Sequence, residues 1–271
     1  MLKKIFGRLT YKNRKFYDDD FDWENYTADS YRRRISSDIE PQFSTSLEGN
    51  QFRFDSQNGT VSGLGKELHP NVQLILEAIG QLGPQSLHEV GCGGGDHVAN
   101  AKTLFPEIQV TGGDRGASQL AMALERHPEL EGKIGLQDIT MPFTNQWPQV
   151  DLVYSQAVLM HIHTAVSHFV ALSNLTRIAR KYILLVENVQ CHNFVADLSA
   201  LHAGGHLAWK SLFLYYLEGS TGARGILLSN EKLSYPELLS DEQLRVGVKF
   251  SKRRILRSAE DSARGSFGFQ Q

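Results

Sequence analysis

The sequence has few cysteines, no long apolar run and almost no net charge. Two cysteines among 271 residues, Cys92 and Cys191, cannot form a disulfide framework, and no C-x-x-C pair indicates a zinc site. No run of 18 or more apolar residues is present, so the sequence predicts no membrane-spanning helix. A net charge of −2 gives no overall attraction to nucleic acid or to an anionic surface. These absences indicate a globular protein of a reducing compartment, and we expect it to be cytoplasmic.

What the chain does have is an alternation of helix-like and strand-like segments from about residue 70 onward. Apolar residues at helical spacing predict a helix over 70–82, with Pro70 in its first turn. The strands predicted from short β-rich runs are 86–91, 108–114, 133–139, 150–155, 181–188, 210–218 and 223–229, with helices at 96–105, 117–127, 164–180 and 192–203. This order predicts an α/β fold with a doubly wound, mostly parallel sheet, helices on both faces and one antiparallel strand at the end.

The two ends of the chain differ from this alternating region in composition. We expect residues 1–66 to be an extension that serves as a lid or docking segment, with turns over 54–65, and residues 236–271 to be a polar, basic tail after a domain at 67–235. One face of a short N-terminal helix would carry Leu2, Ile5, Phe6 and Leu9, and the opposite face Lys3, Lys4 and Arg8. This pattern is typical of a helix lying on an anionic membrane, and the alternative is a helix packed on the core. Peripheral membrane contact is therefore one expectation.

Residues 91–95 contain four glycines in five positions, directly after the first predicted strand. Glycine allows positive φ and close backbone approach to a ligand, and open α/β sheets bind ligands at such strand ends. A dinucleotide loop, G-x-G-x-x-G, would need glycine where Asp96 or Val98 stands, so the spacing argues against that ligand. The spacing that fits is Glu89-x-Gly-x-Gly-x-Gly. A carboxylate before the glycines suits a ligand with positive charge, such as an ammonium beside a sulfonium.

This pattern resembles motif I of the class I S-adenosylmethionine-dependent methyltransferases. Three further segments are similar to the family in the same order: "VTGGD", which ends in Asp114; "QDITMPF"; and "VDLVYSQAVLMHI". The resemblance covers about residues 70–230. It implies a seven-stranded Rossmann-like methyltransferase fold with an antiparallel last strand, and S-adenosylmethionine as the cofactor.

The resemblance also implies a set of cofactor-binding residues at the strand ends. These are Glu89, Gly91, Gly93, Gly95, Asp114, Arg115, Asp138, Ile139 and Ser155. Asp114 would bind the ribose hydroxyls and Asp138 would lie near the adenine amino group. Each acid has a second explanation when taken alone: Glu89 as a solvated strand end, Asp114 as a helix N-cap, and Asp138 as a turn former.

Methyl transfer is an in-line displacement that needs an aligned nucleophile and, for a hydroxyl acceptor, a base within reach of its proton. The catalytic candidates are His161, Glu187 and His163, and each has an alternative role. His161 matches a family histidine that usually packs. Glu187 could be a plain strand-end carboxylate, and His163 could begin the next helix. Glu187 and Asn188 also resemble the Asp-Asn pair of magnesium-dependent O-methyltransferases. The expected strand-four aspartate is missing, so Mg²⁺ is an alternative that the sequence disfavours.

The segments that follow the fourth and fifth predicted strands are rich in His, Asn, Gln and Tyr. This polar character indicates a methyl acceptor that forms hydrogen bonds. We expect O-methylation of a sugar, a glycan or another polar small molecule. One alternative is an RNA or protein methyltransferase that docks through its basic ends, and the near-neutral charge speaks against nucleic acid. Another is a non-catalytic subunit that keeps the fold and serves as a partner for a second enzyme.

Overall fold

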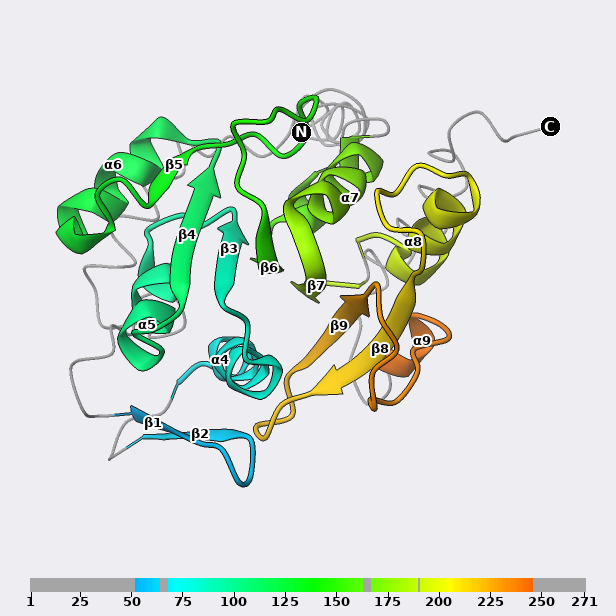
Figure 1. Ribbon diagram of the computed structural model, residues 1–271, viewed down its shortest axis with the longest axis horizontal. Coiled ribbons are helices and arrows are strands. Elements are labelled where there is room, and N and C mark those ends of the chain that lie inside the picture. The colour runs from blue at the N-terminus through cyan, green and yellow to red at the C-terminus, as the bar shows by residue number, and fades with distance from the viewer. Residues whose placement is uncertain (1–51, 64–67, 163–166, 190, 246–271) are drawn as a thin grey trace, which may run out of the picture.

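The computed structural model describes residues 52–63, 68–162, 167–189 and 191–245. These residues form one seven-stranded sheet covered by helices on both faces, together with a small hairpin (Figure 1). The predicted helix at the N-terminus and residues 246–271 of the expected basic tail lie outside the described residues. Within the described ranges, none of the helices is both long enough and apolar enough to cross a membrane.

The sheet has the strand order β5-β4-β3-β6-β7-β9-β8. The strands are β3 (Ser86–Val90), β4 (Gln109–Asp114), β5 (Ile134–Leu136), β6 (Val150–Gln156), β7 (Ala179–Val186), β8 (Phe213–Glu218) and β9 (Arg224–Ser229). Strands β3 to β7 pair in parallel, and β9 runs antiparallel between β7 and β8. The predicted doubly wound sheet with an antiparallel last strand is therefore confirmed. The chain order reverses at β3, which has β4 on one side and β6 on the other, and this places a ligand crevice at its carboxyl end.

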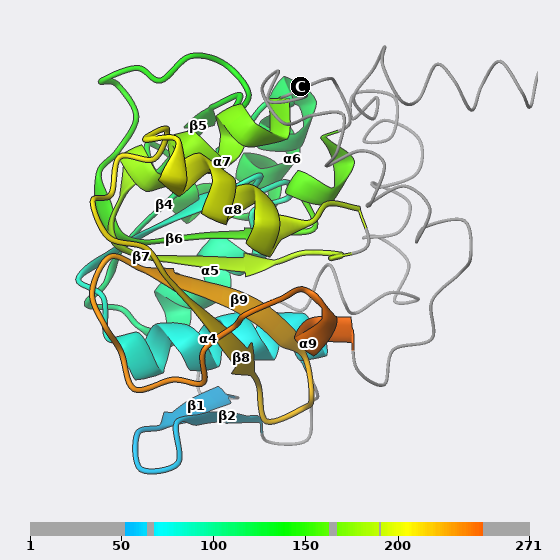
Figure 2. The same cartoon turned by 90° about the vertical axis from the view of Figure 1, so that its right-hand side faces the viewer.

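The helices lie in the order that the sequence predicts. They are α4 (Pro70–Leu82), α5 (Asp96–Leu104), α6 (Ala117–Arg126), α7 (Ser167–Ile178) and α8 (Phe194–Ala203), with the short turns η3 (Pro128–Leu130), η4 (Leu159–His161) and α9 (Glu242–Arg245). Helices α4 and α5 cover one face of the sheet, and α7 and α8 cover the other (Figure 2). Strand β6 contributes to both cores because its side chains alternate between the two faces, with Leu152 in one core and Val153 in the other.

The structure differs from the sequence prediction at both ends of the domain. The turns expected over 54–65 are instead a hairpin of β1 (Phe52–Asp55) and β2 (Thr60–Gly63), and only the four residues between the strands turn. The hairpin forms because Phe52 and Val61 bury their side chains against the α4 side of the core. Residues 236–245, at the start of the expected tail, also pack on the domain, since Leu238 and Leu244 are buried.

Candidate functional site

The glycine loop, residues 91–95, joins the carboxyl end of β3 to the first turn of α5. Gly91, Gly93 and Gly95 all have positive φ, at 74°, 50° and 80°. At Gly91 glycine is also required sterically, because a Cβ atom would lie 2.3 Å from Cγ2 of Val158. The loop therefore presents bare backbone at the sheet edge, in close contact with the segment that follows β6.

Asp114, the last residue of β4, lies beside this loop as the sequence predicts. Its Oδ2 accepts a hydrogen bond from the Gly93 N–H at 2.9 Å, and its Oδ1 accepts one from the Gly116 N–H at 2.8 Å. Burial raises the pKa of the Asp114 carboxyl group, whereas the two hydrogen bonds and the charge of Arg115 oppose that rise. Arg115 itself is exposed at the rim. The carboxylate is thus held in place by backbone donors from both sides.

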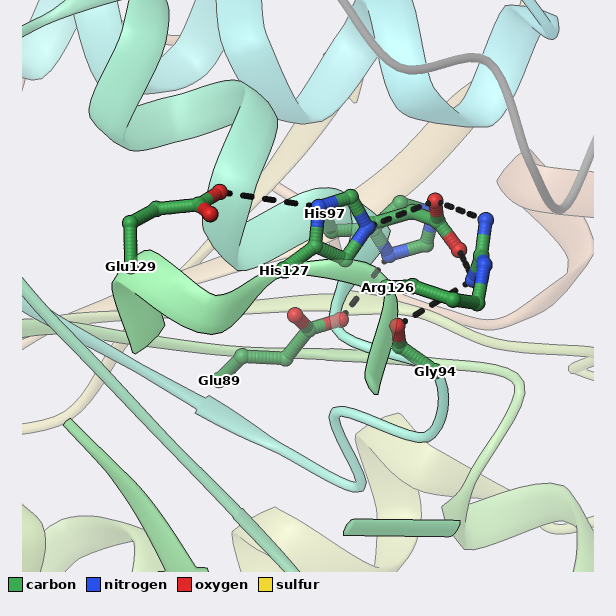
Figure 3. A network of polar contacts seen from close by, with 7 residues as sticks. Glu89, Gly94, His97, Arg126, His127 and Glu129 are labelled. Atoms are coloured by element: carbon green, nitrogen blue, oxygen red, sulfur yellow. Dashed lines mark hydrogen bonds and ion pairs between the residues drawn. The ribbon is translucent and has the colours of Figure 1, made fainter. Parts of the chain in front are cut away.

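Glu89 is buried rather than a solvated strand end, with only 2% of its surface exposed. Its carboxylate accepts a hydrogen bond from the Tyr154 hydroxyl at 3.2 Å. It also lies 2.8 Å from Nδ1 of His97 (Figure 3). A carboxylate can only accept, so His97 Nδ1 donates. Sequence analysis missed His97, whose only signal is its position in the first turn of the helix after the glycines.

A second carboxylate at the glycine loop, that of Asp96, is paired with two side chains: Arg126 at the end of α6 and His127 directly after it. Both Arg126 guanidinium nitrogens lie 2.6 Å from its two oxygens, and Nε2 of His127 lies 3.1 Å from Oδ1. Arg126 also donates to the carbonyl of Gly94 at 3.2 Å, and Glu129 lies on the far side of His127 (Figure 3). This network holds the Gly94 carbonyl and the Asp96 carboxylate on the α6 side of the glycine loop.

Asp138 and Ile139 follow β5, which ends two residues before them. Oδ1 of Asp138 accepts hydrogen bonds from the backbone N–H and the hydroxyl of Thr140 at 2.9 and 2.6 Å, so the residue does form a local turn. Ile139 is buried, and the side chain of Asn174 donates to its carbonyl at 2.8 Å. A backbone hydrogen bond from Gln137 to the Asp114 carbonyl, at 2.9 Å, ties this turn to the end of β4.

The ends of β6 and β7 meet through one side-chain hydrogen bond. Ser155 is fully buried, and its hydroxyl donates to Oε1 of Glu187 at 2.8 Å. The same carboxylate accepts hydrogen bonds from the backbone N–H groups of Val158, Leu159 and Met160 at 3.1, 3.2 and 3.1 Å. Burial raises the pKa of Glu187, and these hydrogen bonds oppose the rise. Both side chains are therefore engaged in hydrogen bonds within the protein.

The two predicted histidines have different outcomes. His161 is half-buried at the end of η4, and its backbone N–H donates to the carbonyl of Val158 at 3.0 Å. His163 lies outside the described residues. In the part of the chain that the structure describes, no group of three or more His, Cys, Asp and Glu side chains is arranged to hold a metal ion. Glu187 accepts four hydrogen bonds from N–H and O–H donors, three at Oε1 and one at Oε2.

Part of the sequence is similar to a known family. Residues 88–182 match the profile of a family described as "Methyltransferase domain". No curated protein matches the sequence.

Many solved structures resemble the fold at low sequence identity. One is an amino pentose methyltransferase of Micromonospora echinaspora with S-adenosylmethionine bound (14% identity, 62% of this chain, 93% of that chain, TM-score 0.48). Another is the magnesium protoporphyrin IX methyltransferase of Synechocystis PCC 6803 (14% identity, 77% of this chain, 95% of that chain, TM-score 0.46). A third is the N-methyltransferase NodS of Bradyrhizobium japonicum (15% identity, 74% of this chain, 96% of that chain, TM-score 0.44).

Proposed function

We propose that the chain is an S-adenosylmethionine-dependent methyltransferase that methylates a hydroxyl group of a sugar, a glycan or another polar small molecule. The match of residues 88–182 to a methyltransferase-domain family supports the reaction class. The observation that carries the proposal is the meeting of two acidic strand ends at one bare loop. Glu89 is the last but one residue of β3, Asp114 is the last residue of β4, and the Gly93 N–H donates a hydrogen bond to the Asp114 carboxylate.

The residues at this edge fit the cofactor in charge and in shape. The glycines of the loop carry no side chains of their own and have positive φ, which allows close approach to the backbone. We infer that the cofactor's methionine part would lie along the glycine loop near Glu89, its ribose at Asp114 and Arg115, and its adenine at Asp138 and Ile139. When bound, S-adenosylmethionine supplies an activated methyl group on a sulfonium.

The protein's own contribution to transfer is to place the acceptor and to take its proton. We infer that His161, half-buried on the segment after β6, is the base, and His163 is the second candidate for that role. Ser155 donates a hydrogen bond to Glu187, and Glu187 accepts others from backbone N–H groups, which supports a role for the pair in holding this segment. The neighbouring polar side chains of Gln156 and, after β7, Asn188 favour an acceptor that forms hydrogen bonds.

The test is transfer of isotope-labelled methyl from S-adenosylmethionine to separate panels of sugars, glycans, RNA and proteins, with and without Mg²⁺. We expect label in a sugar or glycan, none in RNA, and loss of transfer in the Asp114→Ala variant. Label confined to RNA or protein would overturn the acceptor class. Binding of the cofactor without transfer to any panel would favour the non-catalytic subunit instead.

A further inference from the structure

The segment after β6, residues 157–161, is held by side chains that follow β7; we call it the β6 loop. Glu187 accepts hydrogen bonds from three successive backbone N–H groups of this loop, those of Val158, Leu159 and Met160. His192 holds the same loop from its carbonyl side, because its Nε2 donates to the Leu159 carbonyl at 2.9 Å. Residues about thirty positions away in sequence therefore hold the loop through its backbone N–H groups and through one of its carbonyl groups.

The β6 loop also touches the glycine loop. The side chain of Val158 occupies the space beside Gly91, where a Cβ atom would be only 2.3 Å from it. Any shift of the loop at Val158 thus changes the wall of the crevice in which the cofactor is proposed to bind.

The conformation of the β6 loop is not one that the chain would adopt unaided. Ala157, its first residue, has φ of 55°, and it is the one non-glycine residue with positive φ in the described ranges. Such a conformation costs an alanine about 1–2 kcal/mol. Strained residues persist where surrounding contacts determine the backbone. The three backbone N–H groups directly after Ala157 supply those contacts by donating to Glu187.

We propose that Glu187 is a positioning residue of the methyltransferase site: its carboxylate holds the β6 loop against the glycine loop and thereby forms one wall of the cofactor crevice. This inference rests on the proposed function. It assigns the strand-end glutamate a role different from that of a general base, because its carboxylate is already engaged in four hydrogen bonds within the protein. Three of these end on Oε1 and one on Oε2.

The charge of Glu187 matters to this role as well as its shape. An ionised carboxylate offers two acceptor oxygens, whereas the amide of glutamine offers one acceptor and one donor group. In Glu187→Gln the amide nitrogen would face a backbone N–H, so at least one of the four hydrogen bonds is lost. Hydrogen bonds to a charged group are about twice as strong as neutral ones, so the remaining bonds weaken too.

The chain offers a matched control in Glu77, on α4. This buried carboxylate also accepts hydrogen bonds from backbone N–H groups, those of Val61 at 3.2 Å and Ser220 at 2.9 Å, but it lies on the α4 face and joins the β1–β2 hairpin to the β8–β9 turn. Glu77→Gln therefore perturbs a similar buried group without touching the β6 loop.

The experiment measures two quantities in wild type, Glu187→Gln and Glu77→Gln: S-adenosylmethionine affinity by calorimetry, and amide hydrogen exchange by NMR. For Glu187→Gln we expect affinity to fall about tenfold and exchange to accelerate at Val158, Leu159 and Met160 while β3 and β4 stay protected. For Glu77→Gln we expect affinity within about twofold of wild type, the scatter expected for a distant, independent site.

The positioning role is overturned if Glu187→Gln binds S-adenosylmethionine as tightly as wild type and its three loop amides exchange at the wild-type rate. If Glu187→Gln does not fold, Ser155→Ala keeps the carboxylate and removes one donor, and it should produce the same changes to a smaller degree. Wild-type protein that fails to bind S-adenosylmethionine would refute the proposed function, and exchange at the three amides would still decide whether Glu187 holds the loop.

Discussion

The carboxylate of Asp114 accepts a hydrogen bond from the backbone N–H of Gly93 at 2.9 Å. The end of β4 thereby holds the loop that follows β3, the neighbouring parallel strand. One acid thus fixes the glycine loop and also stands where the ribose is proposed to bind. Because these two functions share one side chain, cofactor affinity and loop geometry should respond together to changes at this position.

Gly91→Ala tests the contact between the glycine loop and the β6 loop. The new methyl group would meet Val158 at 2.3 Å and would stand on a backbone with φ of 74°. We expect the free energy of unfolding to fall by about 2–4 kcal/mol from clash and backbone strain together. Urea denaturation measures this change, and calorimetry should show weaker S-adenosylmethionine binding.

Gly132→Ala separates the cost of backbone strain from the cost of steric clash. Its φ is 70°, and no atom lies within 4 Å of the new Cβ. It should cost only about 1 kcal/mol and leave cofactor binding intact. Equal costs at both glycines would contradict the packing of Val158 against Gly91.

Arg126→Ala tests the network on the outer side of the glycine loop. Asp96, 4% exposed, would lose two hydrogen bonds of 2.6 Å and keep only His127. A buried charge that loses its main partner costs stability, so we expect a loss of about 2–3 kcal/mol in urea denaturation. Glu242→Ala removes an ion pair whose carboxylate is 76% exposed, and it should cost less than about 1 kcal/mol. A cost for Arg126→Ala as small as that of Glu242→Ala would show that the network contributes little.

The pair formed by His97 and Glu89 should make stability depend on pH. Burial of the His97 ring favours its neutral form, but the charge of Glu89, the hydrogen bond to it and the charge of Asp96 outweigh burial, so the pKa of His97 is raised. A raised pKa means that the folded state holds the proton more tightly than the unfolded chain does. This stabilisation is fully present below about pH 6.5, the ordinary histidine value, and is lost as pH rises through the folded-state pKa.

The measurement is the free energy of unfolding of wild type and His97→Gln as a function of pH. The difference between the two proteins should be largest below about pH 6.5 and should shrink as the solution becomes alkaline. A difference that stays constant, or that grows with pH, would mean that His97 is neutral in the folded protein.

The fold and the backbone of the site could be predicted because both depend on local patterns. Alternating strand and helix periodicity gave the sheet, and parallel strands bring their carboxyl ends to one edge, which places Glu89, the glycine loop and Asp114 together. The hairpin at 52–63 was missed since its strands are only four residues long and are rich in turn-forming residues.

The side-chain partners could not be predicted, because they depend on directions across elements that are distant in sequence. Nothing in the pattern around Asp96 indicates that Arg126 lies opposite it, and Glu187 gave no sign that it binds the amides after β6. For the same reason a strand-end carboxylate in a sequence indicates a polar edge, and only the structure separates a free base from a side chain that is bonded to backbone.

The most direct test of the account is calorimetric titration of S-adenosylmethionine into wild type, Asp114→Asn and Asp151→Asn. Asp151 is a matched control, since it too is a buried carboxylate bonded to a backbone N–H, but at the opposite end of the sheet. We predict binding by wild type and Asp151→Asn, and affinity at least about tenfold weaker in Asp114→Asn. Wild-type affinity in Asp114→Asn, or no binding by the wild-type protein, would contradict a cofactor site at the glycine loop.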